Sequence, residues 1–179
     1  MSPAAMKVTP KRMSSSMPEA YSAAVVTVSD SCARGERVDQ SGPAAAEILV
    51  QHGFHVVAQE TVPDDQAAVQ RILQTLSETA RLVITTGGTG IAPRDITPEA
   101  TRAVCDRLLD GISERMRTEG AKNTKFAALS RAVCGVRGNA VLLNLPGSPK
   151  GAVESLSAVI DILPHALQLL DGDTNHSSQ

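Results

Sequence analysis

A glycine-rich segment is the clearest candidate for ligand chemistry in this sequence. Residues 85–90 read Thr-Thr-Gly-Gly-Thr-Gly and continue an apolar run at 82–84. Glycine allows a backbone to approach a ligand closely and to expose successive N–H groups, and threonine hydroxyls add neutral donors. The segment therefore suits phosphate or another anion, although it is neither a P-loop nor a GxGxxG dinucleotide loop. A glycine turn of purely structural use is the alternative interpretation.

Two aspartates are the candidates for charged chemistry near that segment. Asp95 follows it closely, and Asp64 comes just after the alternating stretch 54–62. A carboxylate beside a bound phosphate repels it, unless a metal ion bridges the two or the carboxylate accepts a hydrogen bond from a neutral ring. Asp64 could instead cap the helix that follows, a common role for aspartate, and Asp95 could be solvated or paired with Arg94. The residues alone predict a phosphate-containing ligand and a divalent cation.

Two further polar segments follow apolar runs. Ser29, Asp30 and Ser31 come after the run 23–28, where they could contact ribose or phosphate or simply cap a turn. Residues 144–148 precede a helix pattern, so their backbone amides could hold a second anion or form an ordinary strand-to-helix turn. The four histidines lie outside these segments, and their spacing predicts no metal cluster.

Alternating strand and helix patterns must position these segments. Short apolar or alternating runs predict strands at 23–28, 54–62, 82–86, 133–136 and 140–144. Amphipathic patterns predict helices at about 41–52, 68–76, 97–108, 113–120 and from 150 onward with a restart at Pro164. We expect Thr97 to cap its helix. The order predicts a three-layer α/β/α fold with a mostly parallel sheet and one antiparallel strand, which binds ligands at the carboxyl ends of its strands.

Composition bounds what such a fold can do. The 179 residues are 42% hydrophobic and 20% charged, as in soluble globular proteins, and we expect one domain at 21–170 between disordered tails at 1–20 and 171–179. A net charge of −2 argues against a nucleic-acid partner. The three aromatic residues are too few for an RNA-stacking platform or an aromatic flavin site, and no apolar run is long enough for a membrane span.

The number and spacing of the cysteines indicate the cellular compartment of the protein. Cys32, Cys105 and Cys134 are odd in number and widely spaced, which fits neither a zinc site nor a disulfide framework. Together with the lack of an apolar signal segment, they predict a reducing, cytoplasmic location.

Several separate motifs resemble the molybdopterin-binding family, which includes the bacterial molybdopterin adenylyltransferases of the MogA and MoaB types and the G domain of gephyrin. The glycine-rich segment 85–90 and the stretch Pro-Arg-Asp-Ile-Thr-Pro-Glu-Ala at 93–100 are similar to the family's signature. Further similar segments lie at 28–31, 62–65, 129–132, 135–138 and 143–149, so the resemblance covers about 23–170. The loop 32–37 is an individual version of a variable segment.

The resemblance implies a reaction and a set of site residues. In that reaction Mg-ATP adenylylates molybdopterin, and pyrophosphate is released. Asp64 and Asp95 match the family's functional aspartates, and Asp64 also becomes the candidate ligand for Mg²⁺. The nucleotide-binding residues would be Ser29, Asp30, Gly87 and Gly88. The molybdopterin-binding residues would be Thr86, Gly88, Thr89, Gly90, Arg131, Asn144, Pro146, Gly147 and Ser148.

The resemblance also implies partners. It predicts a homotrimer that hands its product to a molybdenum-insertion enzyme. A molybdopterin carrier or scaffold without catalytic activity is the main alternative. A domain of the insertion enzymes themselves is less well supported, because the chain has no room for their additional domains. A flavodoxin-like redox protein is opposed by the shortage of aromatic residues.

Overall fold

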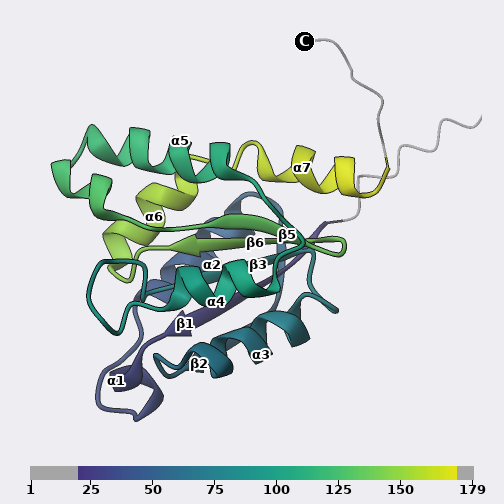
Figure 1. The fold of residues 1–179 in the computed structure, drawn as a ribbon. Helices are drawn as coiled ribbons and strands as arrows, with labels where there is room; N and C mark the ends of the chain where they lie inside the picture. The colour runs from purple at the N-terminus through teal and green to yellow at the C-terminus, as the bar shows by residue number, and fades with distance from the viewer. Residues whose placement is uncertain (1–19, 173–179) are drawn as a thin grey trace, which may run out of the picture.

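One sheet covered by helices forms the part of the chain that this computed structural model describes, residues 20–172 (Figure 1). The strands are β1 (Ser22–Val28), β2 (His55–Val62), β3 (Leu82–Thr86), β4 (Arg107–Leu108), β5 (Cys134–Arg137) and β6 (Ala140–Leu145). The helices are α1 (Asp30–Ala33), α2 (Ser41–Gln51), α3 (Gln66–Leu76), α4 (Thr97–Val104), α5 (Asp110–Ala121), the 3₁₀ helix η1 (Lys125–Leu129), α6 (Pro149–Ser157) and α7 (Leu163–Leu170). No helix among them is both long enough and apolar enough to cross a membrane.

The described sheet has the strand order β2-β1-β3-β6-β5-β4. β2, β1, β3 and β6 pair in parallel, whereas β5 runs antiparallel to both β6 and β4. β4 therefore points the same way as β6, and β5 is the one reversed strand, which confirms the predicted fold class. The chain moves from β1 to β2 on one side and then to β3 on the other. Ligands bind at such a switch point in open α/β sheets.

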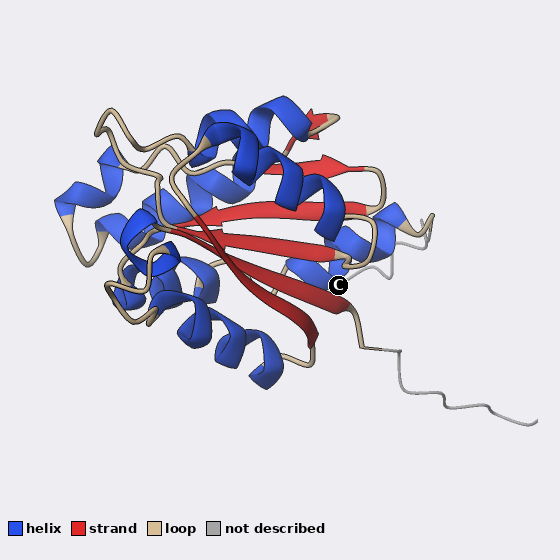
Figure 2. Cartoon of the chain, turned by 90° about the horizontal axis from the view of Figure 1, so that it is seen from below, coloured by secondary structure: helices blue, strands red, loops and turns tan. Residues whose placement is uncertain are grey.

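Helices cover both faces of the sheet and make the predicted three layers (Figure 2). Alternate residues of β1 separate two cores: Ala23 and Val25 pack with α2, α5, α6 and α7, while Ala24 and Val26 pack with α3 and α4. β3 and β6 are buried along their whole length, as central strands covered on both faces are. This packing fixes the strand ends that carry the polar segments.

Two expectations from the sequence are wrong, one at the end of α4 and one just after β1. The helix expected at 97–108 ends at Val104, because Cys105 is extended and residues 107–108 pair with β5 as strand β4. The N–H of Asp106 donates to the carbonyl of Val136 at 2.7 Å, so sheet hydrogen bonds replace helical ones there. The polar segment after β1 is also more than a loop, because Asp30–Ala33 form the short helix α1.

The two ends of the described chain are held together. The hydroxyl of Tyr21 donates to Asp171 Oδ2 at 3.1 Å, and Arg81 forms an ion pair with Asp171 Oδ1 at 2.6 Å. Asp171, which the sequence assigns to a C-terminal tail, is therefore anchored. Apart from Ala20, Asp171 and Gly172, the tails predicted at 1–20 and 171–179 lie outside the described residues.

Candidate functional site at the strand ends

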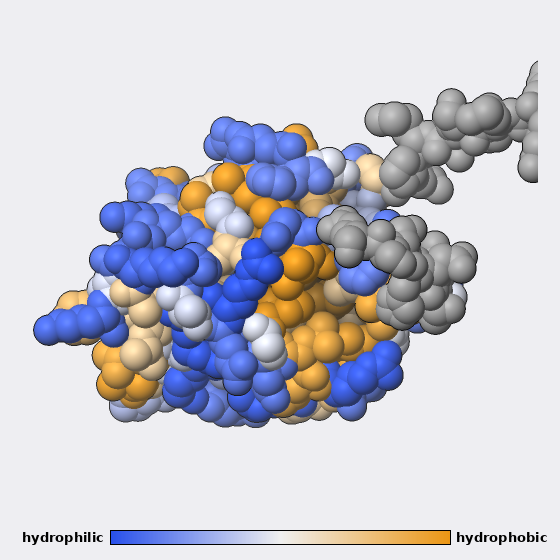
Figure 3. Space-filling model, turned by 90° about the horizontal axis from the view of Figure 1, so that it is seen from above, coloured by the Kyte–Doolittle hydropathy of each residue, from blue (hydrophilic) through white to orange (hydrophobic). Residues whose placement is uncertain are grey.

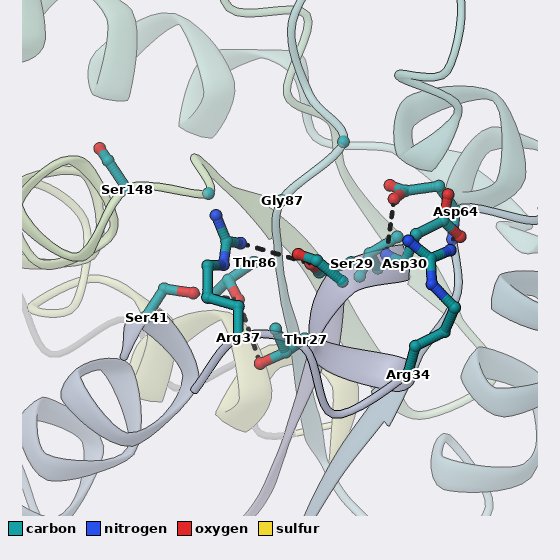
Figure 4. A pocket seen from close by; sticks show the side chains of 14 residues that line it. Thr27, Ser29, Asp30, Arg34, Arg37, Ser41, Asp64, Thr86, Gly87 and Ser148 are labelled. Carbon is teal, nitrogen blue, oxygen red and sulfur yellow. Dashed lines mark hydrogen bonds between the residues drawn. The ribbon is translucent and has the colours of Figure 1, made fainter. Parts of the chain in front are cut away.

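A cavity of about 530 Å³ opens at the carboxyl ends of β1 and β3 (Figure 4). Its lining includes Val28 at the end of β1, Thr86 at the end of β3, and Asp64 just after β2. The strand register brings these positions level, because Val28 pairs with Val62 of β2 and Thr27 pairs with Thr86. The cavity therefore lies at the switch point of the sheet, where the sequence predicts ligand binding.

Asp30 and Asp64 join the ends of the first two strands. The N–H of Asp30 donates to Asp64 Oδ2 at 2.9 Å, and the N–H of Asp64 donates to Asp30 Oδ1 at 3.0 Å. The residue that caps α3 is Asp65, whose Oδ1 accepts from the N–H of Ala68 at 2.8 Å. The Asp64 carboxylate is therefore not used as a helix cap, and it lines the cavity. Ser29, the residue before Asp30, caps α1.

The glycine-rich segment turns at Gly87 and Gly88, whose φ angles are 98° and 62°. A Cβ on Gly87 would lie 2.4 Å from the carbonyl oxygen of Val28, so this close contact with β1 requires glycine. The Thr97 hydroxyl donates to the Gly87 carbonyl at 2.9 Å, and the Thr97 N–H donates to the Gly88 carbonyl at 3.1 Å. Thr97 is therefore the first residue of α4 and fastens the glycine-rich segment, in place of the capping role predicted for it.

These carbonyl contacts leave the N–H groups of the segment available. Within the described residues, the N–H groups of Gly88, Thr89 and Gly90 have no hydrogen-bond acceptor. Asp64 Oδ1 lies close to this stretch, since a Cβ on Gly88 would be 3.6 Å from it. Successive N–H groups of this kind form an anion-binding cradle. The Gly88 end of this cradle thus lies beside the Asp64 carboxylate at the cavity, whereas Thr89 and Gly90 do not line the cavity in the described chain.

Backbone atoms build part of the cavity wall beside the cradle. A Cβ on Gly147 would lie 3.1 Å from the Cα of Gly87, so the loop after β6 packs directly on the glycine-rich segment. Gly147 and Ser148 both line the cavity, and Ser148 caps α6 by accepting from the N–H of Gly151 at 3.2 Å. Pro146 packs behind this turn against Gly151 and does not line the cavity in the described chain.

Hydrogen-bonded hydroxyls support the base of the cavity. Thr27 donates to Asp39 Oδ2 at 2.6 Å, and Asp39 Oδ1 accepts from the N–H groups of Ser41 and Gly42, both at 3.1 Å. The hydroxyls of Ser41 and Thr86 lie 3.0 Å apart. A Cβ on Gly42 would lie 2.4 Å from Asp39 Oδ2, so glycine permits this approach. The network holds the start of α2 against the ends of β1 and β3.

Two arginines beside the cavity are neutralised by carboxylates. Arg34 donates to both oxygens of Glu36, at 2.7 and 2.9 Å. This pairing holds the pKa of Glu36 below its usual value and raises the pKa of Arg34. Arg94 forms an ion pair with Asp30 Oδ2. Because Asp30 Oδ1 already accepts from Asp64, both oxygens of the Asp30 carboxylate are engaged.

Arg37 is placed differently from these two arginines. Its Nη2 donates to Ser29 Oγ at 3.3 Å, and no carboxylate of the described chain lies within 4.0 Å of its guanidinium. Neither Arg34 nor Arg37 is among the site residues predicted from sequence, because 32–37 reads as a variable loop. Their position, three residues apart and just after the strand end at Ser29, is the signal that could have found them.

The carboxylates at the cavity fit a magnesium ion. No three His, Cys, Asp or Glu side chains in the described residues converge as a set of metal ligands. Mg²⁺ does not need such a set, because it is usually held by one or two carboxylates and completes its shell with water and substrate phosphates. Asp64 Oδ1 accepts no hydrogen bond from the described residues and lies beside the cradle, so it is a donor of the required kind.

Four further predicted site residues do not line the 530 Å³ cavity of the described chain: Thr89 and Gly90, Asp95 in the loop after them, and Arg131 before β5. Asp95 Oδ2 accepts from the N–H of Ala92 at 2.8 Å and would lie 2.8 Å from a Cβ on Gly90. Arg131 donates to the carbonyls of Gly90 at 2.6 Å and Asp95 at 2.5 Å, and it pairs with Glu99. Arg131 thus fastens this loop, instead of presenting a free guanidinium to an anion.

Asn144, the last residue of the strand predicted at 140–144 and the first of the polar segment 144–148, lies inside the protein. It belongs to β6 and is fully buried. Its amide nitrogen donates to the hydroxyls of Thr85 at 2.9 Å and Thr101 at 2.8 Å, and its amide oxygen accepts from the N–H of Val133 at 3.2 Å. These contacts join β3, α4 and the segment before β5. The structure therefore gives Asn144 an internal, structural position, and the binding role expected for it from the resemblance stays a prediction.

Two of the three free cysteines are unreactive by their surroundings. Burial raises the pKa of the Cys105 thiol to about 11 and that of Cys134 to about 12. Both thiols therefore remain protonated at neutral pH, whereas a nucleophilic cysteine needs the thiolate. Neither residue lines the cavity.

The fold and the cavity define an α/β protein with an anion cradle and a carboxylate at the switch point of its sheet. A family model described as a probable molybdopterin binding domain matches residues 24–165. The chain belongs to this molybdopterin-binding family, which confirms the resemblance seen in its motifs.

Known relatives agree in sequence and in structure. The chain is 38% identical over 156 residues to the molybdopterin adenylyltransferase of Helicobacter pylori strain J99, covering 83% of this chain and 87% of that protein. It is 38% identical to the molybdenum cofactor synthesis protein cinnamon of Drosophila melanogaster, of which it spans only 27%. The crystal structure of the molybdopterin biosynthesis enzyme MoaB from Thermus thermophilus superposes with a TM-score of 0.81 at 49% identity, covering 86% of this chain and 98% of that one.

Proposed function

We propose that this protein acts in molybdenum cofactor biosynthesis as a nucleotidyltransferase that adenylylates molybdopterin with Mg-ATP. The observation that carries the proposal is the position of Asp64 Oδ1 beside Gly88, the first of three successive residues whose N–H groups have no acceptor within the described chain. A cradle of neutral donors next to an uncommitted carboxylate suits a polyphosphate bound together with Mg²⁺. Relatives named molybdopterin adenylyltransferase, at 38% identity over most of the chain, support the choice of substrate.

In the proposed reaction a terminal phosphate oxygen of molybdopterin attacks the α-phosphorus of ATP. A new P–O bond forms, the bond to the β-phosphate breaks, and pyrophosphate leaves with that electron pair. The chain contributes position and charge: the cradle holds phosphate oxygens through N–H groups, and Asp30 fixes Asp64. When bound at Asp64, Mg²⁺ would neutralise charge on the triphosphate and the leaving group.

The remaining site assignments are part of this proposal. Ser29, Asp30, Gly87 and Gly88 would contact the nucleotide. Asp95, at the far end of the cradle loop, would act on the molybdopterin side together with the backbone of Thr89 and Gly90 and with Thr86, Pro146, Gly147 and Ser148. Arg131 would contribute to molybdopterin binding indirectly, because it holds the loop that contains Gly90 and Asp95 in place.

A homotrimer is the assembly that we propose. Figure 3 shows apolar surface, crossed by polar bands, on the side of the molecule that carries α5 and α7. Helix α7 carries the exposed apolar residue Leu169, with 43% of its surface accessible. Light scattering at micromolar concentration should give three times 18.7 kDa, and a mass of one chain would contradict the trimer. Hand-over to a molybdenum-insertion enzyme and a cytoplasmic location remain predictions.

The reaction is tested by measuring pyrophosphate release from Mg-ATP with and without molybdopterin. We expect release that depends on molybdopterin and produces adenylyl-molybdopterin in equal amount. Bound molybdopterin with no pyrophosphate and no adenylylated product would favour the alternative, a carrier. Omitting Mg²⁺ and adding a chelator should abolish release if the metal acts as proposed.

A further inference from the structure

A second cavity of about 390 Å³ adjoins the first. The two share the lining residues Arg37, Ser41, Gly147 and Ser148. The shared residues come from the loop before α2, the first turn of α2 and the loop after β6. The boundary between the cavities is therefore built by residues outside the glycine-rich segment, and of the two cavities only the larger one is lined by Asp64, Gly87 and Gly88.

Arg37 is the only shared lining residue that carries a charge. Figure 4 shows its guanidinium between Ser29 and Ser148 in this view, in front of the base of the cavity. Its hydrogen bond to Ser29 Oγ is long, at 3.3 Å, and no carboxylate in the described part of the chain neutralises it. Arg34 and Arg94, by contrast, are paired with Glu36 and Asp30.

An unpaired guanidinium at a cavity boundary selects an anion, because its fork of N–H donors matches the oxygens of a phosphate group. Ser29 and Ser148 add hydroxyls to the wall of the larger cavity. A reaction that joins phosphate groups of two substrates must bring both groups to one place, and a phosphate-binding group where two cavities meet can help to hold them there. The position of Arg37 satisfies that requirement.

We propose that Arg37 binds a substrate phosphate group at the boundary of the two cavities, as a second anion site separate from the cradle. This inference rests on the proposed adenylyl transfer for the identity of the substrates. The phosphate could belong to the nucleotide or to molybdopterin, and the shared chemistry is a phosphate oxygen held by a guanidinium. Arg37 supplies charge and orientation and takes no part in bond formation.

The test begins with inorganic pyrophosphate as the probe, titrated calorimetrically into the full chain. Arg37→Gln should weaken its binding about 10-fold to 100-fold, the range expected for a lost charged hydrogen bond. Arg37→Lys keeps the charge but not the fork, so its affinity should lie between wild type and Arg37→Gln. Arg71→Gln on α3 removes one exposed positive charge that lines neither cavity, and this variant should bind pyrophosphate as wild type does.

Equal pyrophosphate affinity for wild type and Arg37→Gln would overturn the proposal, and so would a wild type that binds no pyrophosphate. Separate titrations with Mg-ATP and with molybdopterin assign the source: the ligand whose affinity falls in Arg37→Gln is the one whose phosphate Arg37 holds. The result is independent of turnover. If pyrophosphate binding depends on Arg37 but no adenylyl-molybdopterin forms, the Arg37 site stands and the proposed reaction fails.

Discussion

Asp30 and Asp64 each accept a hydrogen bond from the other's backbone N–H, at 2.9 and 3.0 Å. This reciprocal pair connects the strand ends of β1 and β2 across 34 residues of sequence. It leaves Asp64 Oδ1 as the carboxylate oxygen beside the cradle, while Arg94 neutralises the outer oxygen of Asp30. One aspartate therefore has a supporting role and the other is presented to the cavity.

Asp64→Asn should lose activity while keeping the fold. An asparagine oxygen can still accept from the N–H of Asp30, but it lacks the charge that Mg²⁺ requires. We expect pyrophosphate release to fall at least about 100-fold, the range typical for loss of one electrostatic group at an active site. Asp65→Asn is the matched control, because asparagine caps a helix as well as aspartate does. Normal rates in Asp64→Asn would remove Asp64 from the mechanism.

Gly87→Ala should destabilise the protein more than Gly35→Ala. Both glycines have positive φ angles, 98° and 71°, so both variants carry a conformational penalty of about 1–2 kcal/mol. Only at Gly87 would the new Cβ also meet a backbone oxygen, that of Val28 at 2.4 Å, whereas nothing lies within 4 Å at Gly35. Overpacking adds a further ~1–3 kcal/mol. Urea unfolding measures the difference, and equal losses would contradict the packing described for the cradle.

Asn144→Ala tests whether this residue is structural. The variant leaves two buried hydroxyls and the N–H of Val133 without their partner. Each unsatisfied buried group costs about 1–3 kcal/mol, so thermal unfolding should shift downward strongly. Asn139→Ala in the exposed turn between β5 and β6 is the control and should unfold as wild type does. A variant with normal stability and selectively weaker molybdopterin binding would restore the binding role.

The Arg131–Glu99 pair should contribute to stability only above acid pH. Hydrogen bonding from Arg131 lowers the pKa of Glu99 below its usual value of 4.5. Because the folded-state pKa is the lower one, the contribution is present above about pH 4.5 and is lost as pH falls through the folded pKa. Both partners are partly exposed, so Glu99→Gln should cost only about 0.2–1 kcal/mol at neutral pH. Glu114→Gln, without an ion pair in the described chain, is the control in denaturant titrations across this range.

Sequence patterns predict the central part of the fold well. β1 and β3 are continuous apolar runs because both faces of these strands are covered, and the glycine-rich segment follows β3 directly. Sequence patterns do not predict β4, because a strand of two residues has no periodicity of its own. It is a strand only because its residues pair with β5. Local preference for helix at 105–108 gives way to sheet hydrogen bonds that form at long range.

The candidate site is predictable in part, for reasons visible in single residues. Asp64 and Gly87 can be predicted as site residues because they lie in recognisable motifs just after predicted strands, and in the structure both line one cavity. Asn144 is misplaced when it is grouped with the loop after it, although residues 142 and 144 share one face of β6 and residues 141, 143 and 145 share the other. Arg37 lies in a loop without periodicity, so its position between two cavities can be found only in three dimensions.

The contact between Gly87 and Gly147 constrains how this chain can change over generations. Any missense mutation of the Gly87 codon adds a side chain where a backbone oxygen of Val28 already stands, and a Cβ on Gly147 would in turn lie 3.1 Å from the Cα of Gly87. No amino acid offers a milder replacement, since glycine alone lacks a Cβ. Ligand preference can therefore change through substitutions of the cavity-lining residues Arg34 and Arg37. It cannot change through Gly87, where the backbones of two segments are in contact.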